Sequence, residues 1–135
     1  WDAEPRPLMD AVRLREIAAA GWELGLHSHA HRNLRDLSSA ETAEDVRRCT
    51  AEFARLGLPA APAFAFPFGG RPRGGPERAA LREALSDAGV KLAFRIGGRG
   101  NKLPLPDPFE VNRIGPRGDR SDGDFRWRIR WGRFP

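Results

Sequence analysis

Residues 21–37 read GWELGLHSHAHRNLRDL and hold all three histidines of the chain, His27, His29 and His31. The residues just before them, 23–26, form a short strand-like run. Neutral imidazole is the commonest protein ligand for borderline metals such as zinc. Three histidines at alternate positions after a strand therefore indicate a metal site, although a solvated loop or a single hydrogen-bonded histidine is the alternative.

Spacing restricts which histidines can share one ion. In a fully extended chain His27 and His31 would stand about 13 Å apart, which is too far. In one helical turn their Cβ atoms would lie about 5–6 Å apart, with His29 facing away. A His27/His29 pair would instead need the strand to continue. Because the polar residues 31–35 favour the end of the strand, we expect a helical turn that pairs His27 with His31 and leaves His29 exposed.

Two motifs in this sequence resemble those of the polysaccharide deacetylases, also called NodB-homology or carbohydrate esterase family 4 domains. The second family motif reads Gly-x-Glu-(Ile/Leu)-Gly-x-His-(Ser/Thr)-x-x-His, and residues 64–69, FAFPFG, resemble the third motif in its Phe-Ala-Tyr-Pro-Tyr-Gly form. The resemblance extends from about residue 8 to residue 118. The positions that match the second motif and the leucines after it are Gly21, Glu23, Leu24, Gly25, His27, Ser28, His31, Leu34 and Leu37.

The resemblance implies a metal-dependent hydrolysis of an N-acetyl or O-acetyl group on a glycan or polysaccharide. His27 and His31 would hold a divalent ion, zinc in the first instance, together with an aspartate from the family's first motif. A further aspartate of that motif would be the catalytic base. Ser28 and Asn33 would support the two ligands.

The third motif implies a site for the oxyanion of the reaction. The backbone N–H of Phe68 would hold this oxyanion, and Pro67 and Gly69 would form the same turn. The substrate partner is then an acetylated glycan, and the bond broken is a carbon–nitrogen bond other than a peptide bond, or an ester.

Three departures from the family pattern matter for activity. No Asp-Asp pair precedes Gly21, where Asp2 and Asp10 each stand alone. Ala65 occupies the place where many members carry an arginine, and no histidine follows His31. We therefore expect these 135 residues to be inactive by themselves. The alternative is a deacetylase-like module without catalysis, kept for binding a glycan or a partner.

The length of 135 residues suits one domain. Because the family's barrel usually needs more residues and this chain begins at Trp1, we expect 1–135 to be a single partial domain, an α/β part of a distorted (β/α) barrel that lacks the first strands. Such a start says nothing about a signal peptide, so the compartment stays open. No apolar run approaches the roughly 18 residues of a membrane span. The only cysteine, Cys49, excludes an internal disulfide.

The net charge of +5 and the pI near 10.8 raise nucleic acid as a partner. The basic residues are mostly arginine and gather late in the chain, where aromatic residues alternate with them in the segment FRWRIRW, 125–131. Such a mixture can bind phosphates and stack bases. We favour a solvated amphipathic edge over a nucleic-acid interface. The arginines concerned are Arg113, Arg117, Arg120, Arg126, Arg128, Arg130 and Arg133.

Helical and strand patterns alternate along the chain. Helices are expected over 8–20, 38–56 and 76–88, and strands over 23–26, 63–66, 91–95 and 109–114. Ser38 or Ser39 would cap the second helix, whose core face would be Ala43, Val46, Cys49, Phe53 and Leu56. The tail from residue 121 fits a strand or a helix, and we favour the helix.

This order of elements predicts a parallel α/β sheet. The active sites of such sheets lie beyond the carboxyl ends of the strands. The loops after the first two strands, which carry His27 and Phe68, should therefore meet at one rim.

Overall fold

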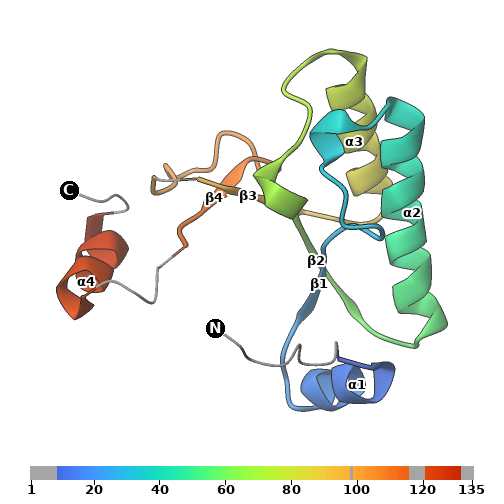
Figure 1. Ribbon diagram of the computed structural model, residues 1–135, viewed down its shortest axis with the longest axis horizontal. Coiled ribbons are helices and arrows are strands. Elements are labelled where there is room, and N and C mark those ends of the chain that lie inside the picture. Colours follow the sequence, from blue (N-terminus) through green and yellow to red (C-terminus); the bar gives the residue numbers. More distant parts are fainter. Residues whose placement is uncertain (1–8, 98, 116–120, 132–135) are drawn as a thin grey trace, which may run out of the picture.

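The computed structural model describes residues 9–97, 99–115 and 121–131, and it is centred on a parallel four-stranded sheet (Figure 1). The strands are β1 (Leu24–Leu26), β2 (Ala60–Ala65), β3 (Leu92–Ile96) and β4 (Val111–Arg113), in the order β1-β2-β3-β4. Each neighbouring pair is parallel. The predicted parallel α/β architecture is confirmed.

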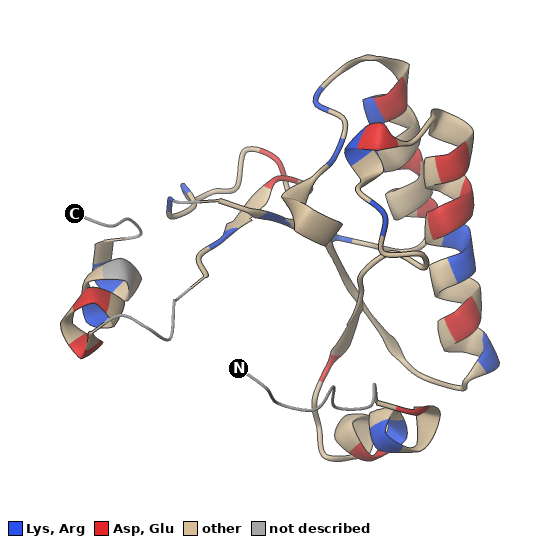
Figure 2. Cartoon of the chain, viewed as in Figure 1, with Lys and Arg blue, Asp and Glu red and all other residues tan. Residues whose placement is uncertain are grey.

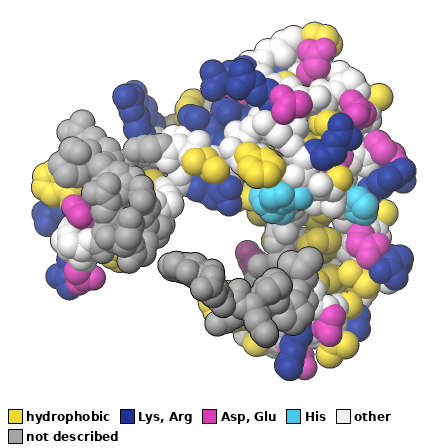
Figure 3. Space-filling model, viewed as in Figure 1, with side chains coloured by type: hydrophobic (Ala, Val, Ile, Leu, Met, Phe, Trp, Pro, Cys, Tyr) yellow, Lys and Arg dark blue, Asp and Glu magenta, His cyan; other side chains and the backbone are white. Residues whose placement is uncertain are grey.

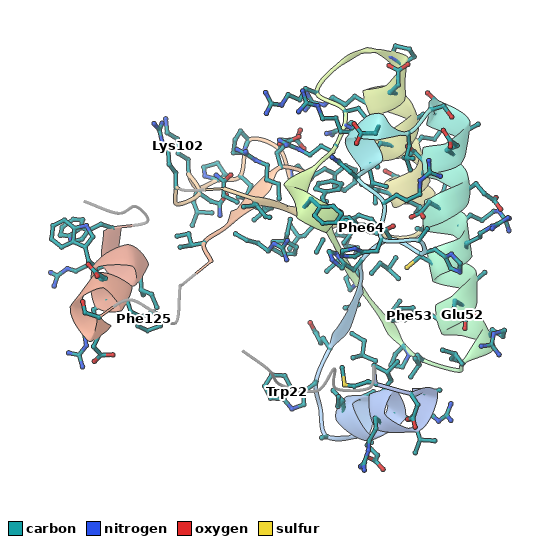
Figure 4. The ribbon with its side chains drawn as sticks, viewed as in Figure 1. Trp22, Glu52, Phe53, Phe64, Lys102 and Phe125 are labelled. Atoms are coloured by element: carbon teal, nitrogen blue, oxygen red, sulfur yellow. The ribbon has the colours of Figure 1, made fainter. Side chains whose placement is uncertain are left out.

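Helices α2 (Ser39–Arg55) and α3 (Gly75–Asp87) connect β1 to β2 and β2 to β3, and they lie side by side against the sheet (Figure 1). The core forms between them and the strands, with Phe64 near its centre (Figure 4). Burying a side chain of this size contributes roughly 1.5–3 kcal/mol. The main core residues are Leu26, Leu34, Leu37, Val46, Cys49, Phe64, Phe66, Leu81, Leu85, Val90 and Ala93.

Two further helices stand at the periphery. Helix α1 (Ala11–Ala19) starts at Asp10, whose side chain accepts the N–H of Arg13, and is followed by Gly21 at φ +88°. It buries no residue, and Arg15 donates to the carbonyl of Leu56 at the end of α2. Helix α4 (Asp122–Trp131) confirms the helical interpretation of the tail and keeps its aromatic side chains exposed, Phe125 among them (Figure 4).

Helix α2 begins as its sequence predicts and buries part of the predicted face. Ser38 is the N-cap and forms a complete capping box with Glu41. Val46 and Cys49 are buried and Phe53 packs against the core, as predicted, whereas Ala43 is exposed. The buried row also includes Thr42 and Asp45, so that residues 42, 45, 46 and 49 have the i, i+3, i+4, i+7 spacing of one helix face.

Charged residues are paired over much of the described surface. Acidic and basic residues both line α2 (Figure 2). The ion pairs include Arg47 and Arg48 with Glu44, Arg55 with Glu52, and Arg78 and Arg82 with Asp107.

In the described part of the chain, no helix has the length and apolar character needed to cross a bilayer.

Candidate functional site

The predicted rim is present at the carboxyl ends of β1 and β2. The rings of His27 and His31 have centroids 5.0 Å apart with an interplanar angle of 66°. The ring of His31 lies 5.0 Å from that of Phe68, which belongs to the short 3₁₀ turn η2 (Pro67–Gly69). Histidines therefore lie beside a hydrophobic side chain on the face shown in Figure 3.

The pairing of His27 with His31 was predicted, but the helical turn expected to produce it is wrong. Residues 27–31 form an irregular loop in which Ser28 has φ +67° and His31 has φ +51°. With left-handed backbone at both positions, the two rings converge without helical spacing. His29 is exposed, as expected.

The ring of His27 has a fixed orientation. Its Nδ1 lies 2.6 Å from the carbonyl oxygen of Ala65. A carbonyl can only accept a hydrogen bond, so Nδ1 carries the proton and the lone pair of the neutral ring lies on Nε2. This is the arrangement that a metal-binding histidine uses when its second nitrogen is held by a backbone carbonyl.

The loop that carries the histidines is attached to α2 by Asp45, a residue the sequence reasoning did not select. The Asp45 side chain accepts the backbone N–H groups of His29 and Ala30, each at 3.0 Å. Asp45 is only 7% exposed. A signal was available, because Asp45 is a carboxylate on the same helix face as Val46 and Cys49, where an apolar residue would be expected.

The turn after β2 presents a backbone N–H group. Phe68 has φ +55° and ψ +7°, and the N–H groups of Gly69 and Gly70 donate to the carbonyls of Phe66 and Pro67. The N–H of Phe68 donates no hydrogen bond to any of the described residues. Phe68 itself is exposed.

The two residues expected to support the histidines are placed differently from each other. Asn33 accepts the N–H of Arg35, and its side chain fills the space beside Gly70, where an ideal Cβ would come within 1.7 Å of Asn33 Oδ1. Asn33 thus joins the histidine loop to the loop after β2. The hydroxyl of Ser28 is buried and has no hydrogen-bond partner within the described ranges. In those ranges neither side chain bonds a histidine ring.

An ion-pair cluster lies next to the Phe68 turn, and the sequence did not predict it. Arg71 pairs with Glu110, and one of its terminal nitrogens lies 3.5 Å from the carbonyl oxygen of Gly69. Glu110 also pairs with Arg95 on β3 at 3.2 Å. The signal was weak, because these residues are far apart in the sequence and belong to no motif.

The two histidines have the chemistry and spacing to hold one ion. Two imidazoles bound tetrahedrally to one zinc at about 2.0–2.1 Å place their ring centroids roughly 5 Å apart, which matches the 5.0 Å observed. No third histidine, cysteine, aspartate or glutamate joins them in the part of the chain that the structure describes.

Comparison with known proteins shows the family of this chain. Residues 8–93 match the family model of the polysaccharide deacetylases. The chain belongs to the polysaccharide deacetylase family. The matched region includes both the histidine loop and the Phe68 turn of this family member. A search of curated proteins gave no significant match.

Solved deacetylase structures share the fold of this family member. It is similar to the Streptococcus pyogenes deacetylase PplD in complex with acetate, with a TM-score of 0.71, 14% identity, and coverage of 87% of this chain and 49% of that one. For a de-N-acetylase from Aggregatibacter actinomycetemcomitans the TM-score is 0.66 at 14% identity, with coverage of 87% of this chain and 52% of that one. For IcaB from Ammonifex degensii the TM-score is 0.59 at 26% identity, with coverage of 81% of this chain and 48% of that one. The chain thus spans about half the length of these structures.

Proposed function

We propose that this member of the polysaccharide deacetylase family serves metal-dependent hydrolysis of N-acetyl or O-acetyl groups on a glycan. The observation that carries the proposal is the convergence of His27 and His31, 5.0 Å apart, beside Phe68 at the carboxyl ends of β1 and β2. The acetate complex and the de-N-acetylase among the similar structures support acetyl removal as the reaction.

His27 and His31 are the residues that would hold the metal, with zinc the first candidate. The hydrogen bond from His27 to Ala65 leaves Nε2 as the ligand atom of that ring. A divalent ion bound there supplies a Lewis acid for the acetyl carbonyl and lowers the pKa of bound water towards about 7.

The Phe68 turn would bind the developing oxyanion. The N–H of Phe68 has no acceptor among the described residues and lies on the turn whose side chain contacts His31. A backbone donor held in advance stabilises negative charge at little reorganisation cost. Pro67 and Gly69 serve this function by fixing the turn, since Gly69 adopts φ +69° and approaches Ile96 too closely for a Cβ.

The third metal ligand and the catalytic base would be aspartates of the family's Asp-Asp motif. Among the described residues, no third metal-ligating side chain groups with His27 and His31. The second candidate is a deacetylase-like module that binds a glycan without cleaving it. A nucleic-acid interface formed by the late arginines is the weaker alternative, and Arg126 among them pairs with Asp122 at 3.6 Å.

Zinc titration of single-histidine variants tests the metal site. We expect His27→Ala and His31→Ala to lose most of the zinc affinity of the unchanged chain, because each removes one of the two converging ligands. His29→Ala is the matched control and should retain it, since His29 is exposed and contributes only its backbone N–H to the Asp45 contact. Equal losses in all three variants, or no zinc binding by the unchanged chain, would refute the proposed site.

A further inference from the structure

Asp45 is a buried carboxylate on α2 that is hydrogen-bonded to the backbone of the histidine loop. Its two oxygens accept separate backbone donors, Oδ2 from His29 and Oδ1 from Ala30, both at 3.0 Å. In the part of the chain that the structure describes, no ion pair involves Asp45. A buried charge is costly unless its hydrogen bonds are satisfied, so the loop and this carboxylate stabilise each other.

Cys49 lies one helical turn beyond Asp45 on the same buried face of α2. Burial is the main cause that raises the pKa of the Cys49 thiol, and the nearby Asp45 charge adds to it. This face of α2 therefore holds the loop backbone at residues 29 and 30 through Asp45.

The attachment bears directly on where the two rings lie. Ser28 and His31 adopt left-handed backbone that L-residues rarely choose on their own. Such a conformation persists when surrounding contacts fix it, and the Asp45 bonds fall between these two residues. Without them, the segment between His27 and His31 would be free to relax, and the rings would separate.

We propose that Asp45 is a positioning residue, which acts through the backbone of His29 and Ala30 to hold the rings of His27 and His31 together. Its carboxylate faces the loop backbone and not the rings. The positioning of the rings is a property of this chain alone, and only the effect on metal affinity rests on the proposed function.

The decisive variant is Asp45→Asn, which keeps the shape of the side chain but replaces one acceptor oxygen by a donor that opposes an N–H. We expect the nuclear Overhauser contact between the His27 and His31 rings to weaken and the amide hydrogens of His29 and Ala30 to exchange faster. Zinc affinity should fall by about 10–100-fold, as for other groups that orient metal ligands. Asp45→Glu, which restores the charge, should recover part of each signal, and it decides the question if the asparagine variant does not fold.

Two controls separate positioning from general stability. Glu44→Gln alters the adjacent carboxylate, which is paired with Arg47 and Arg48 on the surface, and should leave the ring contact and zinc affinity unchanged. Leu85→Ala removes buried volume on α3 and should lower stability while preserving both signals.

The ring contact and amide exchange keep this test independent of the proposed function. If the unchanged chain binds no zinc, the proposed metal site fails, while those two measurements still decide the role of Asp45. An unaltered ring contact in Asp45→Asn would overturn the inference. So would an equal loss of ring contact in Leu85→Ala.

Discussion

The Nδ1 atom of His27 lies 2.6 Å from the carbonyl oxygen of Ala65, so the residue after β1 is bonded to the last residue of β2. The bond uses only the backbone of Ala65. The bond therefore does not depend on the side chain at position 65, where many family members carry an arginine. One hydrogen bond both joins the two loops of the site and orients the ring proposed to bind metal.

The first prediction concerns the tautomer of His27. In its neutral state this ring should carry its proton on Nδ1, because the Ala65 carbonyl can only accept. Long-range ¹H–¹⁵N correlation spectra distinguish the two nitrogens directly. His29 is exposed to water and provides the internal reference. A neutral His27 protonated on Nε2 would show that this hydrogen bond is absent in solution.

The second prediction concerns the contact between the two loops. Gly70→Ala would place a Cβ 1.7 Å from Asn33 Oδ1, so the Asn33 side chain would have to move and the loops would separate. Overpacking of this kind typically costs about 1–3 kcal/mol, measured as the free energy of unfolding in urea. Gly74→Ala is the control, since nothing lies within 4 Å of its added Cβ. Equal stability of the two variants would show that Asn33 does not pack against Gly70 in solution.

Local sequence signals predicted much of the fold because they act over a few residues. Ser38 caps α2 as predicted, and the positive-φ glycines Gly21 and Gly57 stand just beyond the ends of α1 and α2. The alternation of elements then gave the parallel sheet, and the sheet gave the shared rim of His27 and Phe68.

The geometry of the histidine loop could not be derived in the same way. Left-handed backbone at Ser28 and His31 could not be read from the residue types, since residues other than glycine adopt it in only a few per cent of cases. It depends on Asp45, which lies 15 residues from Ala30 along the chain. Spacing alone predicted that His27 and His31 pair, but it predicted a helical turn where the structure has an irregular loop.

The third prediction separates the roles of the two serines at the start of α2. Ser38→Ala should lower the free energy of unfolding by about 1 kcal/mol, because the Ser38 hydroxyl accepts the N–H of Glu41. Ser39→Ala should have little effect or a slightly stabilising one, since Ser39 is the first helical residue and alanine favours helices. Urea unfolding of both variants measures the difference. A larger loss for Ser39→Ala would move the N-cap by one residue.

The fourth prediction concerns acid stability at the same cap. The backbone N–H of Ser38 is the largest cause that lowers the pKa of Glu41 from 4.5 to about 2, with the Ser38 hydroxyl and Arg32 adding to it. A carboxyl whose folded pKa is depressed stabilises the fold above pH 4.5, and this contribution is lost as the pH falls towards 2. Glu41→Gln should therefore be less stable than the unchanged chain at pH 6 and converge with it near pH 2. A constant difference across this range would mean that the charge of Glu41 is irrelevant to the cap.

The last prediction is that these 135 residues release acetate slowly from acetylated chitooligosaccharides and acetylated xylan, even with zinc or cobalt added. The described residues bring two imidazoles together, and none of them joins the pair as a third metal ligand. Positioned acid–base catalysis is typically worth about 10²–10⁴-fold, and that factor should be missing.

Acetate release is measured against His27→Ala, which reports the background without the metal site. Adding a segment that carries an Asp-Asp strand ahead of residue 1 should raise turnover, and changing its aspartates to asparagine should remove the gain. Rapid turnover by the 135 residues alone would show that the base lies within them and that the proposed mechanism is wrong. Tight glycan binding with no turnover, even after the segment is added, would favour the non-catalytic module instead.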